Sequence, residues 1–173
     1  MTQHSSKKSD MTTSKAIPLP SDVLGSPAPI FTVQSTIGQI TLQQCLGRAV
    51  VLYFYPKDNT PGCTTETENF RDLHDTFIAA NCAIVGASRD SLKSHENFSK
   101  KLGLPFPLIA DPDETLCTLY GVMKLKNMYG KQVRGIERST FLIDAQGKLA
   151  RVWRGVKVPG HAQEVLEAAR ALT

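Results

Sequence analysis

The chain lacks the features that would place it in a membrane or make it a metal protein. Its 173 residues include no apolar run approaching the ~18 residues of a membrane span. The four cysteines, Cys45, Cys63, Cys82 and Cys117, form no Cys-x-x-Cys pair and no cysteine and histidine cluster with zinc spacing. We therefore expect a protein with free thiols that uses no metal and no other cofactor.

The excess of positive over negative charge is also too small to indicate a particular class of partner. The formal net charge is +4, and part of it comes from Lys7, Lys8 and Lys15 in a polar N-terminal segment. No basic helix or aromatic-rich RNA-binding motif accompanies this charge, so we expect no nucleic-acid partner and no membrane partner. Hydrophobic residues at 41% and charged residues at 21% are ordinary for a soluble globular chain with a substantial core.

Residues 1–20 differ in composition from the rest of the chain. They are rich in Ser, Thr and Lys and poor in large apolar side chains, so we expect a mobile polar tail. The segment lacks the apolar stretch of a secretory signal, and its lack of arginine argues against a transit peptide. The sequence therefore predicts a cytoplasmic protein whose single domain spans residues 21–173.

The segment Tyr55–Glu66, YPKDNTPGCTTE, places Cys63 between a strand and a helix. Residues 49–55, AVVLYFY, form an apolar run typical of a strand that is buried on both faces. Apolar residues at helical spacing then predict an amphipathic helix over residues 64–80. Because the unpaired N–H groups and the dipole of a first helical turn stabilise an anion, we expect a reactive, solvent-reachable thiolate at Cys63.

The rest of the chain alternates strands and helices. The predicted strands are residues 30–34, 40–42, 82–88, 139–144 and 148–154; the predicted helices are residues 91–102, residues 113–120 and a last one from about residue 160; residues 124–135 are predicted to form a loop rich in Lys and Gly. Strand and helix in alternation imply parallel pairing. This order is typical of a thioredoxin-like α/β sandwich, a central mixed sheet flanked by helices, with an added N-terminal β-hairpin.

Two separated motifs resemble those of the peroxiredoxins. Pro56, Thr60 and Cys63 match the family's pattern of proline, three residues, threonine, two residues and cysteine, and GIERSTFLID resembles the segment that supplies its active-site arginine, here Arg138. The resemblance to the bacterioferritin comigratory protein or peroxiredoxin Q subfamily runs from about residue 25 to the C-terminus. It implies thiol-dependent reduction of hydrogen peroxide and organic hydroperoxides through a sulfenic acid on Cys63, and it favours a monomer.

A reactive thiolate alone does not account for a fast peroxidase. For a protein thiol whose pKa falls from ~8.5 to ~6, the thiolate fraction at pH 7 rises roughly thirtyfold, but lost nucleophilicity leaves a net gain of about two. Hydrogen-bond donors worth ~3 kcal/mol each must stabilise the charge as the O–O bond breaks. We expect them from the hydroxyl of Thr60, the backbone N–H groups of Gly62 and Cys63, and the guanidinium of Arg138. Pro56, which has no N–H, would shield the thiolate from water.

Two residues of the motif also have a purely structural interpretation. Thr60 suits the N-cap of the predicted helix, which is compatible with a role in catalysis. Glu66 suits a capping-box or helix-dipole position in the first turns. Its negative charge would oppose the thiolate unless it pairs with an arginine.

The chain departs from many relatives in having no evident resolving cysteine. Glu68 and Ser99 stand at the two places where such relatives carry it, so the chain is either a natural one-cysteine enzyme or a Cys→Ser variant. Cys82 and Cys117 are predicted to be buried and are poor substitutes. An external thiol is then needed, with thioredoxin, glutaredoxin or glutathione as candidates. The basic loop around Lys126 could attract an anionic reductant such as glutathione.

Two other functions are compatible with the fold. Thiol-disulfide exchange on proteins normally needs an internal dithiol, but Thr60 stands where the first cysteine of a Cys-x-x-Cys pair would be. A non-enzymatic holdase would need an exposed apolar patch, and none is evident in the sequence. The sequence therefore favours the peroxidase.

Overall fold

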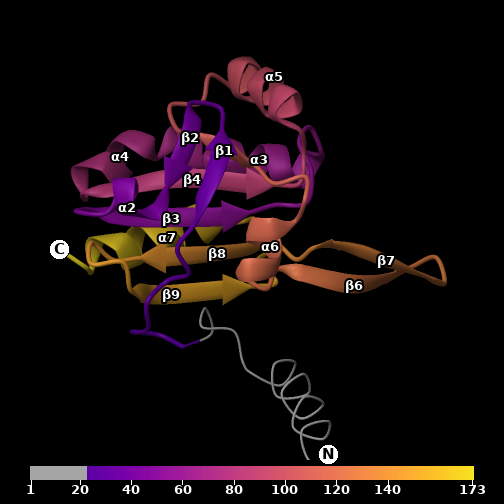
Figure 1. The fold of residues 1–173 in the computed structure, drawn as a ribbon. Coiled ribbons are helices and arrows are strands. Elements are labelled where there is room, and N and C mark those ends of the chain that lie inside the picture. Colours follow the sequence, from indigo (N-terminus) through magenta and orange to yellow (C-terminus); the bar gives the residue numbers. More distant parts are fainter. Residues whose placement is uncertain (1–22) are drawn as a thin grey trace, which may run out of the picture.

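The structure is a computed structural model that describes residues 23–173 (Figure 1). The predicted polar tail, residues 1–20, lies outside the described residues. Within residues 23–173, no helix is both long enough and apolar enough to cross a membrane.

A mixed sheet forms the centre of the molecule. Its seven strands are arranged in the order β2-β1-β5-β4-β3-β8-β9. The strands are β1 Thr32–Ser35, β2 Gly38–Thr41, β3 Ala49–Phe54, β4 Cys82–Ser88, β5 Leu108–Ala110, β8 Ser139–Ile143 and β9 Leu149–Arg154. As predicted, β3 and β4 are parallel, β8 and β9 form an antiparallel hairpin, and an antiparallel hairpin of β1 and β2 is added at the N-terminal side.

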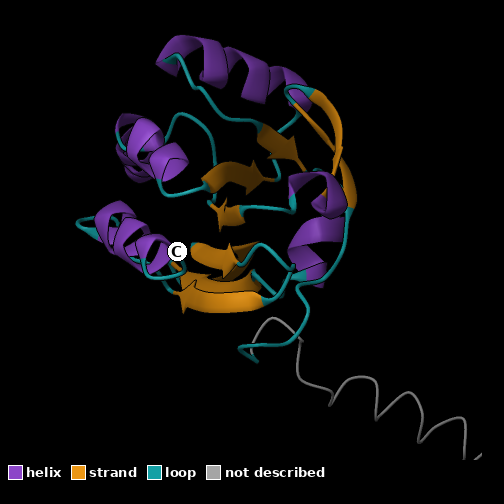
Figure 2. Ribbon diagram, turned by 90° about the vertical axis from the view of Figure 1, so that its left-hand side faces the viewer, coloured by secondary structure: helices purple, strands orange, loops and turns teal. Residues whose placement is uncertain are grey.

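Helices cover both faces of this sheet (Figure 2). They are α2 Leu42–Cys45, α3 Pro61–Asp72, α4 His74–Ala79, α5 Leu92–Leu102, α6 Thr115–Leu119 and α7 His161–Arg170. The buried strand β3 feeds two cores, because alternate side chains of a strand point to opposite faces. Val50, Leu52 and Phe54 pack on the side of α2 and α6. Val51 and Tyr53 pack on the side of α3, α4 and α7.

The helix predicted over residues 64–80 is divided in two. It begins earlier, at Pro61, since proline is favourable in the first turn, and it is interrupted at Leu73, where φ is −97° and ψ is 3°. Phe70 and Phe77, one from each helix, enter the same core with ring centroids 6.0 Å apart. The expectation of one continuous helix was therefore wrong.

The prediction of a loop over residues 124–135 was also wrong, because this segment is a β-hairpin. Strands β6 Met123–Met128 and β7 Lys131–Ile136 pair with each other outside the main sheet. Tyr129 and Gly130 join them with φ of 54° and 78°, as a two-residue turn with positive φ at both positions requires. Tyrosine is unusual there, and this concealed the turn in the sequence. The short elements β5 and α2 were also missed.

A substitution at Gly86 would test how tightly β4 is packed. A Cβ at this position would lie 2.8 Å from Cδ2 of Leu108 and 2.9 Å from Cζ of Tyr53, both fully buried. We expect Gly86→Ala to lower the free energy of unfolding by about 1–3 kcal/mol, as overpacking of a core does. Urea unfolding measures the change. Gly135→Ala is the matched control, because nothing lies within 4 Å of its added Cβ, and an equal loss in both variants would contradict the packing argument.

Candidate active site

Cys63 lies in the first turn of α3, directly after the loop that follows β3. Thr60 is the N-cap residue and Pro61 opens the helix, so the backbone N–H groups of Gly62 and Cys63 have no carbonyl partner inside the helix. Tyr53 of β3 orients α3 through a 3.0 Å bond between its hydroxyl and that of Thr67. The residue Cys63 is only 1% exposed, so it is buried and not open to solvent as we expected.

Arg138 lies against the sulfur of Cys63, although 75 residues separate them in the chain. It follows β7 and precedes β8, and β8 pairs with β3, which leads into the cysteine loop. Its Nη2 is 3.5 Å from Sγ of Cys63, and its Nη1 donates to Oε1 of Glu66 at 2.6 Å. The guanidinium thus joins the thiol to a carboxylate.

Glu66 is the residue whose role the sequence left most open. It is 1% exposed and its Oε1 pairs with Arg138, so its charge is neutralised by an arginine rather than used at a helix cap. Burial raises its pKa to about 7, against the lowering effect of Arg138. Its second oxygen, Oε2, is buried with no hydrogen-bond partner among the described residues. The sequence feature that could have indicated a role in the site is the position of Glu66, three residues after Cys63 and therefore on the same helical face.

The guanidinium of Arg138 keeps its charge in this partly buried position. Burial opposes the charged form, but the negative charges of Glu66 and Cys63 outweigh it and raise the pKa of Arg138. The site also needs a residue without a side chain next to the cysteine. A Cβ on Gly62 would lie 3.2 Å from Nη2 of Arg138, so any larger residue would push the guanidinium away from its position.

Thr60 and Pro56 lie in the loop before the cysteine. The hydroxyl of Thr60 donates to the carbonyl of Lys57 at 2.7 Å and makes no capping bond to the helix. Its proton is therefore used within the loop, and not directed at the thiol as we expected. Pro56 is half-buried, and it lines a cavity of about 340 Å³ together with Lys57, Arg89, Asp90 and Pro112.

A buried polar network that sequence reasoning missed holds this loop in place. Asp58 in the loop accepts hydrogen bonds from the hydroxyls of Tyr55 at 2.7 Å and Ser94 at 2.8 Å. His95 of α5 lies with Nδ1 2.8 Å from the Asp58 carboxylate and Nε2 2.9 Å from the carbonyl of Ile109. Both ring nitrogens of His95 thus lie against oxygen atoms, one of the cysteine loop and one of β5. This polar network ties the cysteine loop to α5 and β5.

The other three cysteines are unsuited to nucleophilic chemistry. Burial raises the pKa of Cys82 to about 12, and burial together with a hydrogen bond to Asp111 raises the pKa of Cys117 further. Burial also raises the pKa of Cys45, although the charge of Arg48 opposes it. Each of these thiols is disfavoured as a thiolate, and Cys63 alone among the cysteines contacts a cationic side chain.

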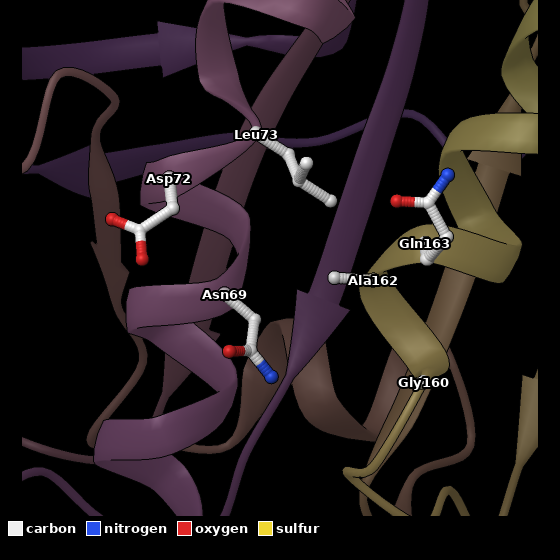
Figure 3. Close-up of a pocket in the computed structure, with 6 residues that line it drawn as sticks. All are labelled: Asn69, Asp72, Leu73, Gly160, Ala162 and Gln163. Carbon is white, nitrogen blue, oxygen red and sulfur yellow. The ribbon is translucent and has the colours of Figure 1, made fainter.

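A separate cavity of about 330 Å³ lies between the end of α3 and the start of α7 (Figure 3). Its lining residues are Asn69, Asp72, Leu73, Gly160, Ala162 and Gln163. The cavity contains no thiol, and its one ionisable side chain, Asp72, accepts a hydrogen bond from Arg71 at 2.9 Å. The residues that line this cavity therefore offer no cysteine nucleophile.

The chain is similar to known proteins over most of its length. The AhpC/TSA family pattern matches residues 24–152. Peroxiredoxin Bcp of Xanthomonas campestris is 52% identical over 152 residues, which cover 86% of this chain and 95% of that protein. Peroxiredoxin Bcp of Bacillus subtilis is 44% identical over 151 residues, 87% of this chain and 96% of the relative.

Solved structures of the X. campestris protein share the fold. One, described in terms of its alkyl peroxide reduction activity, has a TM-score of 0.79 and 49% identity, covering 90% of this chain and 97% of that chain. Two further structures, described as peroxiredoxin Q, are Cys→Ser mutants at two different cysteines, with TM-scores of 0.80 and 0.79. Those two cysteines are separated by as many residues as Cys63 and Ser99 in this chain. The thioredoxin-like architecture predicted from the sequence is confirmed.

The raised pKa of Glu66 makes stability depend on pH. Between the ordinary value of 4.5 and about 7, the unfolded carboxyl has lost its proton and the folded one keeps it. Raising the pH through this range therefore lowers the free energy of unfolding, by about 3 kcal/mol in total at ~1.4 kcal/mol per unit. Urea unfolding of the wild type and Glu66→Gln at pH 4.5 and 7.5 measures it. We expect the difference in free energy of unfolding between the wild type and Glu66→Gln to change with pH. A difference that stays constant would contradict the raised pKa of Glu66.

Proposed function

This chain belongs to the AhpC/TSA family, in its Bcp and peroxiredoxin Q group of cysteine-dependent peroxidases, and we propose that it works through Cys63 by a one-cysteine mechanism. The observation that carries the proposal is the contact between Arg138 and the sulfur of Cys63 at 3.5 Å, in a chain whose other three thiols all have a raised pKa. Hydrogen peroxide and organic hydroperoxides are the proposed substrates, in line with the alkyl peroxide reduction described for the X. campestris protein.

In the first step the thiolate of Cys63 attacks the distal oxygen of the peroxide. An S–O bond forms, the O–O bond breaks, and the alkoxide or hydroxide that leaves takes up a proton to give an alcohol or water. Negative charge moves from sulfur to the leaving oxygen, so a donor that spans both positions stabilises the transition state more than the ground state. The guanidinium of Arg138 is suited to this, because it presents several N–H groups in a plane and stays charged.

The other groups of the loop complete the binding of the peroxide. The N–H groups of Gly62 and Cys63 are available because the first turn of a helix leaves them unpaired. The hydroxyl proton of Thr60 is committed to Lys57, but its oxygen retains lone pairs. We assign Thr60 the role of accepting the peroxide O–H, which would align the attacked oxygen with the sulfur. Pro56 limits the access of water from the side of its cavity.

In the second stage an external thiol attacks the sulfenic acid, releasing water and forming a mixed disulfide, and a second thiol then releases reduced Cys63. Ser99 stands where a resolving cysteine would be needed, so the oxidised sulfur has no internal partner. Thioredoxin, glutaredoxin and glutathione are the candidate reductants. Because Cys63 is only 1% exposed, a protein thiol reaches it only after the first turn of α3 opens. A monomeric state and a cytoplasmic location remain predictions.

Substitution of the nucleophile and its donor tests the first step. We expect Cys63→Ser to abolish the reaction with peroxide and Arg138→Lys to lower its second-order rate constant about a hundredfold, since a lysine lacks the planar fork whose two nitrogens reach the sulfur and Glu66 separately. Stopped-flow mixing with hydrogen peroxide, followed by trapping of the sulfenic acid, measures this. Arg151→Lys, on the exposed part of β9, is the matched control. Full activity in Arg138→Lys would refute the role of the guanidinium.

Restoring a cysteine on α5 tests the one-cysteine mechanism. After one equivalent of peroxide, we expect the wild type to carry a sulfenic acid and Ser99→Cys to form an intramolecular disulfide with Cys63, seen by mass spectrometry as the loss of two hydrogens. Asn97→Cys, exposed on the same helix, is the control and should form no such bond. A disulfide within the wild type, involving Cys45, Cys82 or Cys117, would show that the chain already has a resolving cysteine.

A further inference from the structure

We propose that the β6–β7 hairpin is the docking arm for an acidic protein thiol reductant that recycles Cys63. This inference rests on the proposed function, since it concerns the second substrate of the same site. Figure 1 shows the hairpin projecting from the body of the protein at the edge toward which β3 and β4 run. The loop and helix that carry Cys63 begin where β3 ends at the same edge.

The register of the hairpin gathers its lysines on one face. Lys126 pairs with Val133 and Met128 pairs with Lys131, and residues directly opposite each other lie on the same face of a sheet. Lys124, two residues before Lys126, lies on that face as well. Residues 123–136 contain no acidic side chain. This lysine face, made of Lys124, Lys126, Met128, Lys131 and Val133, is therefore uniformly cationic around two apolar side chains.

The hairpin is attached to the body near its base, through residues of the opposite face. Arg134 forms an ion pair with Glu114 at the start of α6, and Arg89 also pairs with Glu114, at 2.9 Å. Arg89 further donates to the carbonyl of Arg134 at 3.5 Å. At the base, Ile136 is fully buried in the core. Lys126 donates to the carbonyl of Ile136 at 3.1 Å, but no ion pair within residues 23–173 involves a lysine of the hairpin, so the charges of the lysine face have no carboxylate partner there.

The hairpin is continuous with the reaction site. Strand β7 ends at Ile136, and Arg138 follows two residues later against the sulfur of Cys63. Arg89, which holds the hairpin, also lines the cavity of Pro56 and Lys57 beside the cysteine loop. The cavity, which Asp90 also lines, thus lies between the cysteine loop and the arginine that holds the hairpin. A molecule that presents a thiol to Cys63 from this edge would lie along the hairpin.

The exposed side chains favour a protein over a small anion. Tyr129 at the tip is 99% exposed, Leu125 68% and Met128 48%. Apolar and aromatic side chains within a charged rim are typical of protein interfaces, and a molecule the size of glutathione cannot contact the tip and the base together. The lysines require carboxylates opposite them, so the partner surface is acidic. The apolar residues are divided between the two faces of the hairpin, which argues against insertion into a membrane.

A comparison of the two half-reactions tests the docking arm. Oxidation of Cys63 by hydrogen peroxide is measured first by stopped flow. The oxidised protein is then reduced by an acidic thioredoxin, or by uncharged dithiothreitol, at low and high salt. The test variant is Lys124→Gln with Lys126→Gln and Lys131→Gln. The matched control carries Lys93→Gln, Lys100→Gln and Lys148→Gln, which remove the same charge from exposed positions elsewhere.

We expect the hairpin variant to be oxidised at the wild-type rate, to be reduced by thioredoxin about tenfold more slowly at low salt, and to lose most of the salt dependence. Its reduction by dithiothreitol should not change. Failure of Cys63 to oxidise in the wild type, as well as in both variants, would overturn the proposed function itself. Normal oxidation with an unchanged thioredoxin rate, or with an equal loss in the control, would overturn the docking arm alone. So would hairpin-dependent binding to anionic lipid vesicles with an unchanged thioredoxin rate.

Discussion

The ion pair between Arg138 and Glu66 is the interaction on which the site depends. A guanidinium can turn about several bonds, and a single carboxylate at 2.6 Å holds one of its nitrogens so that the other meets the sulfur of Cys63. Both partners are largely removed from water, where such a contact is stronger but also costly to form. Glu66 shows this cost directly, through its unpartnered oxygen and a pKa raised to about 7.

The packing of the sheet supports this interaction from two directions. Strand β3 is buried along its whole length and delivers the cysteine loop at its end, while its antiparallel neighbour β8 begins directly after Arg138. The loop itself is held by the buried contact between Asp58 and His95 at 2.8 Å, which links it to α5. The geometry of the thiol therefore follows from a rigid frame, and the opening needed in the second stage has to act against the first turn of α3 and this link.

The two stages of the reaction place different demands on the surface. A peroxide is small and can be admitted to a thiol that is nearly inaccessible, whereas a reductant protein needs a larger docking area. The compact site at Cys63 suits the first demand, and the projecting hairpin of β6 and β7 suits the second. In the mechanism that we propose, this separation would let the site exclude water during cleavage of the O–O bond and still give an external thiol a place to dock.

The sequence by itself determined the buried strand at residues 49–54, the cysteine at the start of a helix and the alternation that predicts a mixed α/β sheet, because these depend on local periodicity and turn residues. It placed Arg138 by resemblance only, since no local pattern shows which distant side chain meets a thiol. Tertiary structure alone decided that Cys63 is buried, that Glu66 pairs with Arg138, that the Thr60 hydroxyl is bonded to Lys57, and that residues 123–136 project as a hairpin. Burial, ion pairing and side-chain direction arise from contacts between segments far apart in the chain, so local sequence patterns do not predict them.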